Sequence, residues 1–250
     1  MIHSFLLIGQ SNMGGRGVIT DLPLPNDPRI FNLRNGKWRK MYRPVNPDRV
    51  TSGVCLAESF AKCYADDHEG VSVGLIPCAD GGSNIDQWHE GGLLFDHAVY
   101  QCLLAQRTSN IAGILWHQGE GDCGPEKLPV YEEKLLAMVT ALRRTLKLED
   151  VPFLIGGLGD FLPNFKGGHL ATYTEINKSL QSAANKLPLC SYVPAEGLED
   201  KGDSLHFSAR ALWEFGERYY AAFTKLEDKN RIFPEKPTEE TAVRSAMELL

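Results

Sequence analysis

The sequence of 250 residues has no long cationic block, no apolar run of membrane-spanning length and no closely spaced cysteine pair. Its net charge is −6, with acidic and basic side chains interspersed, which argues against nucleic acid as a partner. No stretch reaches the roughly 20 apolar residues that a membrane helix needs, so we expect no membrane partner. The phosphate-binding pattern Gly-x-x-x-x-Gly-Lys-Ser/Thr is also missing, which argues against a nucleotide-binding protein.

The six cysteines are scattered along the chain: Cys55, Cys63, Cys78, Cys102, Cys123 and Cys190. Four of the six lie in apolar periodic segments. We expect buried thiols rather than disulfides, because a chain of this length builds a core without covalent links. Met1 leads directly into the first apolar run, without a basic leader. This favours a cytoplasmic protein, or a secreted one if a leader has been trimmed. The oligomeric state stays open.

Five apolar runs alternate with helical patterns along the chain. The runs predict strands buried on both faces, over 5–8, 71–76, 111–116, 153–158 and 190–193. Apolar residues at helical spacing predict helices over 54–64, 93–105, 127–146, 172–187 and 209–226, with Ser208 as the N-cap of the last. This alternation predicts a single α/β domain over 1–250: a three-layer sandwich with a five-stranded parallel sheet, a core over about 2–226 and a C-terminal tail over 227–250.

Residues 16–51 fit none of these elements and contain five prolines: Pro23, Pro25, Pro28, Pro44 and Pro47. A loop of this length beside a site commonly shapes a substrate cleft. The tail is either a short packed helix or a partner contact, and the sequence leaves both open. In an open α/β sheet the ligand site lies beyond the carboxyl ends of the strands, so those ends are where chemistry is expected.

The first strand ends in the turn Gly9-Gln10-Ser11-Asn12-Met13-Gly14. A serine at this position can point its hydroxyl into the crevice, while the following backbone N–H groups face the same space. Met13 stands where the Gly-x-Ser-x-Gly elbow of the α/β-hydrolases has its second glycine. A glycine-rich turn that binds phosphate is the alternative.

Two further strand ends carry glycine or polar residues. The pair Gly81-Gly82 can approach a ligand closely and leave its N–H groups free, although a plain tight turn has the same composition. After the third strand, Gln118 can donate to an oxyanion, and Glu120 or His117 can serve acid–base chemistry. His117 can equally be a hydrogen-bonded structural residue. No second histidine or thiol stands nearby at ligand spacing, so we expect no metal.

After the fifth strand, Asp203 precedes His206 by three residues. The aspartate can accept the Nδ1–H of the histidine, which leaves Nε2 to take a proton from Ser11. An acidic turn before a surface histidine is the alternative. Because the four segments all fall at carboxyl ends of strands and each supplies a different role, together they predict an acyl-transfer site.

In this order the segments resemble the four blocks of the sialate O-acetylesterase and acetylxylan esterase family, carbohydrate esterase family 6 of the SGNH hydrolases. The similarity covers residues 5 to about 225. The matching blocks are Gly9-Gln10-Ser11-Asn12-Met13-Gly14-Gly15-Arg16-Gly17, Gly81-Gly82-Ser83-x-Ile85-x-x-Trp88, Trp116-His117-Gln118-Gly119-Glu120 and Asp203-x-x-His206-Phe207. The resemblance implies a flavodoxin-like SGNH hydrolase fold and a serine esterase, without a cofactor, that removes O-acetyl groups from carbohydrates.

The resemblance also implies a role for each matching position. Ser11 corresponds to the nucleophile, His206 to the general base and Asp203 to its orienting partner. The implied oxyanion donors are the N–H of Ser11, one N–H of the Gly81–Gly82 turn, and Gln118, which stands where most SGNH hydrolases have asparagine. Three further positions are expected to bind substrate or to order the site: Gln10, Asn12 and Glu120.

The substrate class stays open within these limits. Acetylated xylan or a related sugar is the first expectation, and a sialate O-acetylesterase or a broader short-chain esterase is the alternative. A small acyl group is expected because no apolar stripe near the strand ends indicates an acyl tunnel, while Trp88, Trp116 and the polar first loop can contact a sugar. Outside the enzymes, a catalytically inactive carbohydrate-binding homologue would be expected to have lost Ser11, Asp203 or His206.

Overall fold

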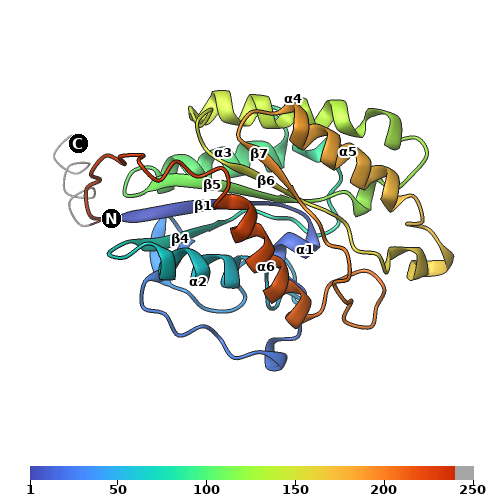
Figure 1. The fold of residues 1–250 in the computed structure, drawn as a ribbon, viewed down its shortest axis with the longest axis horizontal. Helices are drawn as coiled ribbons and strands as arrows, with labels where there is room; N and C mark the ends of the chain where they lie inside the picture. The colour runs from blue at the N-terminus through green and yellow to red at the C-terminus, as the bar shows by residue number, and fades with distance from the viewer. Residues whose placement is uncertain (240–250) are drawn as a thin grey trace.

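The computed structural model describes residues 1–239 and consists of one sheet between two layers of helices (Figure 1). The strands are β1 (Ile2–Gly9), β2 (Ile30–Arg34), β3 (Lys37–Lys40), β4 (Ser72–Pro77), β5 (Asn110–His117), β6 (Phe153–Gly156) and β7 (Cys190–Val193). The α-helices are α1 (Ser11–Gly14), α2 (Ala57–Asp67), α3 (Leu93–Ala105), α4 (Leu128–Leu146), α5 (Tyr173–Lys186) and α6 (Ala209–Phe223). None of these helices is both long and apolar enough to cross a membrane.

The predicted parallel strands form the centre of the sheet. β1 pairs in parallel with β4 on one side and β5 on the other, and β6 and β7 continue beyond β5. The order β4-β1-β5-β6-β7 is that of a flavodoxin-like sheet, whose ligand site lies at the carboxyl end of the first strand. All five predicted helices are present, and the Ser208 hydroxyl accepts from the Ala211 N–H at the start of α6.

The prediction of five parallel strands is wrong in number, because residues 30–40 form a hairpin rather than part of a loop. The sheet has seven strands and is mixed: β2 pairs in parallel with β4 and antiparallel with β3. Asn35 and Gly36 form the turn with φ of 49° and 71°. Positive φ at both residues matches the twist of a two-residue hairpin, and Asn-Gly is the sequence signal for it.

Successive residues of β1 point into two different cores. Leu6 and Ile8 pack under α3, α4 and α5, whereas Phe5 and Leu7 pack under α2 and α6 on the opposite face (Figure 1). Burial on both faces explains why the strands are continuous apolar runs in the sequence. All six cysteines are free thiols, four of them buried in these cores and two half-buried.

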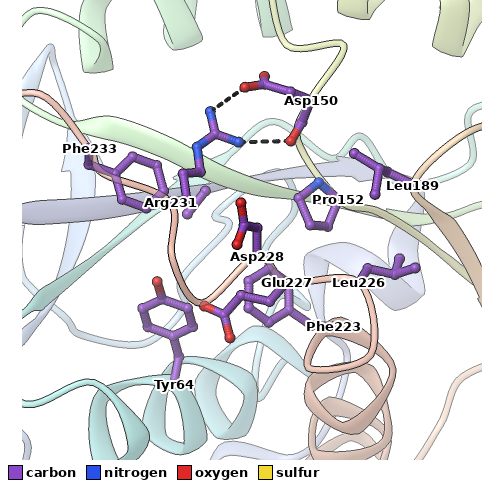
Figure 2. Close-up of a pocket in the computed structure, with 11 residues that line it drawn as sticks. Tyr64, Asp150, Pro152, Leu189, Phe223, Leu226, Glu227, Asp228, Arg231 and Phe233 are labelled. Atoms are coloured by element: carbon purple, nitrogen blue, oxygen red, sulfur yellow. Dashed lines mark hydrogen bonds and ion pairs between the residues drawn. The ribbon is translucent and has the colours of Figure 1, made fainter.

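The segment after α6 returns along the amino ends of the strands, away from α1 (Figure 1). Arg231 donates to the Asp150 carbonyl over 2.8 Å and pairs with its carboxylate over 3.0 Å (Figure 2). Together with apolar side chains such as Phe223 and Phe233, these residues line a cavity of about 60 Å³. Residues 227–238 form no helix, and the part of the predicted tail beyond residue 239 lies outside the described residues.

Candidate active site

Ser11 lies directly beyond the carboxyl end of the central strand, as the first residue of α1. Gly9 ends that strand with φ 131°, and a Cβ there would lie 2.0 Å from the His117 carbonyl oxygen, so only glycine fits. The Gln10 N–H donates to the same carbonyl over 2.9 Å, which holds the turn against β5. The sequence therefore places the serine at the centre of the ligand-binding edge of the sheet.

Three side chains from the two ends of the chain meet at this edge. The His206 Nε2 lies 3.1 Å from the Ser11 Oγ, and the His206 Nδ1 lies 2.7 Å from the Asp203 Oδ2. With Nδ1–H donating to the carboxylate, Nε2 presents a lone pair to the serine hydroxyl. This arrangement can move a proton from the serine to the histidine.

The Asp203 carboxylate is held in its ionised form. Desolvation opposes ionisation, but hydrogen bonds from the His206 side chain and from the N–H groups of His206 and Leu205 outweigh it and lower the pKa of Asp203. The two backbone bonds measure 2.8 Å and 3.0 Å. An ionised carboxylate at this position favours the imidazolium that a proton transfer from Ser11 would produce.

The Gly81–Gly82 turn lies beside the end of β1, since the Asp80 N–H donates to the Gly9 carbonyl over 3.0 Å. The Gly81 N–H donates to the Asp48 Oδ2 over 2.8 Å, so it is already engaged. The N–H groups of Ser11 and Gly82 have no acceptor within residues 1–239. The turn therefore offers one free donor, Gly82.

Gln118 does not have the free amide that an oxyanion donor needs. The residue is fully buried, and its side-chain nitrogen faces Gln10 Oε1 at 3.1 Å, the Ser83 carbonyl at 3.3 Å and Asp122 Oδ2 at 2.6 Å. The two N–H bonds of the Gln118 amide are thus already shared among three acceptors, which leaves none for an oxyanion. The structure thus argues against the predicted donor role, and Gln118 instead connects the turns that follow β1, β4 and β5.

Gln10 orders the same connection from the other side. Its Oε1 accepts from the Gln118 amide and also faces the N–H groups of Gly119 and Gly121, at 3.4 Å and 3.2 Å. The side chain is buried. Of the two roles expected for Gln10, the contacts support ordering of the site rather than substrate binding.

Asn12 and Glu120 form a buried pair behind the histidine loop. The Asn12 amide donates to the Glu120 carboxylate over 2.6 Å and to the Leu205 carbonyl over 3.2 Å. The Asn12 side-chain oxygen accepts from the Phe207 N–H over 3.2 Å. Because Leu205 and Phe207 flank His206, these contacts favour loop ordering by Asn12 and Glu120 over contact with substrate.

The contacts of His117 favour a structural role over an acid–base role. Its ring is fully buried, and Nε2 lies 3.0 Å from the Gly157 carbonyl. Its Nδ1 lies 3.8 Å from the Glu120 carboxylate, beyond hydrogen-bond distance. The described contacts of His117 therefore connect it to the strand ends around it and not to Ser11.

The expectation that Trp88 and Trp116 contact a sugar is wrong. Their exposed fractions are 1% and 0%, and the two rings pack edge to face with centroids 5.4 Å apart. The Trp88 indole N–H donates to the Ser83 Oγ over 3.2 Å. The tryptophans therefore support the Gly81–Gly82 turn from inside the protein.

Sequence reasoning missed Asp48 and Arg49 in the first long loop. Asp48 accepts the Gly81 N–H, and Arg49 donates to the Gly81 carbonyl over 2.9 Å. The contacting residues are more than thirty positions apart, and charged residues in a proline-containing loop carry no local pattern. The loop thus contacts the glycine turn, and its expected role in shaping a substrate cleft stays a prediction.

Most of the chain is similar to a family of carbohydrate esterases. The family model described as carbohydrate esterase, sialic acid-specific acetylesterase matches residues 1–225. A probable carbohydrate esterase from Arabidopsis thaliana is 28% identical over 234 residues, which cover 85% of this chain and 86% of that protein.

Solved structures share the fold over most of the chain. An X-ray structure of an Arabidopsis thaliana protein matches with a TM-score of 0.76 at 26% identity, covering 89% of this chain and 98% of that one. The structure of NanS matches with a TM-score of 0.72 at 19% identity, covering 90% and 97%, and shows a shared fold. With the family model extending over nine-tenths of its length, the chain belongs to the carbohydrate esterase family of the sialic acid-specific acetylesterases.

Proposed function

We propose that this protein is a serine esterase that removes O-acetyl groups from carbohydrates through an acetyl-serine intermediate. The observation that carries the proposal is the continuous contact from Ser11 Oγ to His206 Nε2, at 3.1 Å, and from His206 Nδ1 to Asp203, at 2.7 Å. Family membership supports the class of reaction.

In the proposed reaction, Ser11 Oγ attacks the acetyl carbonyl carbon while its proton passes to His206 Nε2. The oxyanion of the tetrahedral intermediate accepts from the N–H groups of Ser11 and Gly82, and Asp203 stabilises the imidazolium. The bond to the sugar oxygen then breaks, and that oxygen takes the proton from His206. Water, deprotonated by the same histidine, attacks the acetyl-serine and releases acetate.

A catalytically inactive binding protein is the alternative from another class. In such a protein the nucleophile, the base or the carboxylate is expected to be replaced, or to lie out of contact with the other two. Here Ser11 and His206 are in contact despite the 195 positions between them. This contact favours the enzyme.

Replacement of Ser11 tests the proposal. Ser11→Ala is expected to lower kcat on p-nitrophenyl acetate at least about 10⁴-fold, because the attacking atom is gone. Ser182→Ala is the matched control, since Ser182 bonds Glu132 on α4 and belongs to another part of the molecule. Circular dichroism and thermal unfolding check that both variants fold. Wild-type turnover by Ser11→Ala would end the proposal.

A substrate panel tests the carbohydrate and acetyl parts of the proposal. Acetate release is measured from acetylated xylo-oligosaccharides and from O-acetylated sialic acids, next to p-nitrophenyl acetate and octanoate. We expect release from at least one of the sugars and a clear preference for the acetate ester. Equal turnover of the octanoate and the acetate would contradict the acetyl part. Turnover of the aryl esters but of none of the acetylated sugars would contradict the carbohydrate part.

A further inference from the structure

Asp48 gathers hydrogen-bond donors from four other residues beside the glycine turn. Its carboxylate accepts from Arg16 Nη2 at 2.6 Å, Arg16 Nη1 at 3.1 Å, the Asn46 amide at 3.1 Å, the Ser52 hydroxyl at 2.9 Å and the Gly81 N–H at 2.8 Å. The Asp48 and Arg16 side chains are 7% and 3% exposed. Burial opposes ionisation, but bonds from Arg16 and the other donors outweigh it and lower the pKa of Asp48.

Arg49, the next residue, holds the other polar group of Gly81. Its Nη2 donates to the Gly81 carbonyl over 2.9 Å, and its Nη1 donates to the Asp80 carboxylate over 3.0 Å. Two successive loop residues thus fix both the N–H and the C=O of one glycine. The Arg49 side chain is half exposed, whereas the Asp48 side chain is shielded from solvent.

The two glycines of the turn are needed for different reasons. A Cβ on Gly81 would lie 2.4 Å from Arg16 Nη2 and 2.8 Å from Asp48 Oδ2, so the buried ion pair leaves no room for a side chain. Gly82 has φ 81°, and a Cβ there would meet nothing within 4 Å. Gly81 is therefore packed against the ion pair, while Gly82 has open space and a backbone conformation that favours glycine.

The carbonyl that Arg49 holds belongs to the same peptide unit as the Gly82 N–H. In a planar trans peptide the N–H points opposite to the C=O, so fixing the Gly81 carbonyl fixes the direction of the Gly82 N–H. A hydrogen bond from a cation to that carbonyl also polarises the N–H at the other end of the unit.

We propose that Asp48 and Arg49 are positioning residues that select and aim the oxyanion donor of the turn. Asp48 engages the Gly81 N–H, and Arg49 orients the Gly82 N–H, which remains the one donor that the turn adds to the Ser11 N–H. The inference rests on the proposed esterase function, because it assigns the geometry of that reaction's oxyanion.

The first test observes the donor directly. Ethyl p-nitrophenyl methylphosphonate places a tetrahedral phosphorus on Ser11: the Oγ–P bond forms, p-nitrophenolate leaves and His206 takes the serine proton. In ¹⁵N,¹³C-labelled protein, the Gly82 amide is identified by its coupling to the Gly81 carbonyl carbon. We expect the Gly82 amide proton to move downfield in the adduct and the Gly81 amide proton to keep its position. A downfield shift of Gly81 in place of Gly82 would overturn the inference.

The second test alters the orientation of the Gly82 N–H without removing that N–H group. Arg49→Leu is expected to lower kcat on p-nitrophenyl acetate at least about tenfold with KM within threefold, against about a hundredfold or more for loss of a whole donor. Arg49→Lys, which can still donate to the carbonyl, is expected to recover part of that loss. Arg144→Leu is the matched control, because Arg144 is an exposed arginine on α4 that pairs with Glu90. Wild-type kcat in Arg49→Leu would overturn the inference.

The outcomes separate the inference from the function on which it rests. Failure of the phosphonate to label Ser11 in the wild-type protein would remove the esterase proposal and the inference together. Labelling of Ser11 combined with an unchanged Gly82 amide would remove the inference alone. Asp48→Asn is measured alongside, with its thermal unfolding, and is expected to lower both kcat and the unfolding temperature.

Discussion

The Asn12 amide nitrogen lies 2.6 Å from the Glu120 carboxylate, and the pair is buried behind the loop that carries His206. Asn12 lies in α1, which follows β1, and Glu120 lies in the turn that follows the adjacent strand β5. Their contact joins the serine turn to the turn after β5, while the bonds of Asn12 to the backbone of Leu205 and Phe207 join it to the histidine loop, without involving Ser11 or His206. Precise placement of the histidine therefore depends on side chains that do not take part in proton transfer.

Asn12→Ala is expected to lower kcat about tenfold or more and to destabilise the fold by about 1–3 kcal/mol, because buried partners lose their hydrogen bonds. The control is Asn177→Ala, which removes a similar pair of bonds to the Leu158 backbone, at 2.7 Å and 3.1 Å. Steady-state kinetics and urea unfolding measure the two effects. An Asn12→Ala protein that loses stability as the control does, with wild-type kcat, would contradict an ordering role for Asn12.

Asp203→Asn is expected to lower kcat about 10²–10⁴-fold, because a neutral amide neither stabilises the imidazolium nor enforces the tautomer. The pKa of Asp203 in the folded protein is below its ordinary value of 3.8. The ionised carboxylate therefore contributes its full share to the stability of the fold above pH 3.8, and this share is lost only as the pH falls through the lowered pKa. The kcat of Asp203→Asn is compared with that of wild type from pH 5 to pH 8. Because Asp203 is ionised throughout this range in wild type, the deficit should persist across it, and recovery of kcat at pH 5 would contradict the assignment.

Gln118→Ala separates a connecting residue from an oxyanion donor. We expect a loss of about 1–3 kcal/mol in the free energy of unfolding, because the buried acceptors on Gln10 and Asp122 lose their donor. Turnover well below the unfolding temperature should fall less than about tenfold. A hundredfold loss of kcat with unchanged stability is the result that a donor role predicts. Urea unfolding and kcat are measured on the same preparation.

His3 gives the fold a defined dependence on pH. Burial, and then the charges of His68, the N-terminus and Arg231, lower the pKa of His3 from 6.5 to about 4. Between these values the unfolded chain binds a proton that the folded protein does not, so stability rises with pH from about 4 to 6.5. The full effect is about 3 kcal/mol.

Replacement of His3 by a residue that does not titrate checks this sign. His3→Gln keeps a side chain that can bond the Tyr64 hydroxyl, which lies 2.7 Å from His3 Nδ1. Urea unfolding from pH 4 to pH 7.5 should show a flatter pH dependence for the variant than for wild type. Parallel curves would show that His3 is not responsible.

The sequence predicted the parallel centre of the fold because burial on both faces produces continuous apolar runs such as Phe5 to Ile8. Interactions between residues close in the sequence could also be predicted. Examples are the Ser208 cap of α6 and the bond between Asp203 and His206, which are three residues apart. The hairpin was missed although Asn35-Gly36 signals it, because the edge strand β3 is mostly charged and the apolar residues of β2 are interrupted by Asn32.

The rest of the site depends on contacts between distant segments. The Asp48 bond to the Gly81 N–H, 33 positions away, follows only from the folded path of the first loop. The three acceptors around the Gln118 amide likewise come from three turns that only the fold brings together, those after β1, β4 and β5. Sequence shows that an amide can donate, whereas the fold determines how many partners already occupy it.

The bond from the Trp88 indole to Ser83 gives the glycine turn its own optical reporter. Trp88 is shielded from water, and its indole N–H meets a residue adjacent to Gly82. A displacement of the turn that breaks this bond changes the polarity around the ring, and with it the wavelength and intensity of its fluorescence. Displacement of the turn in unlabelled protein would therefore change the part of the fluorescence that comes from Trp88, one of four tryptophans in the sequence.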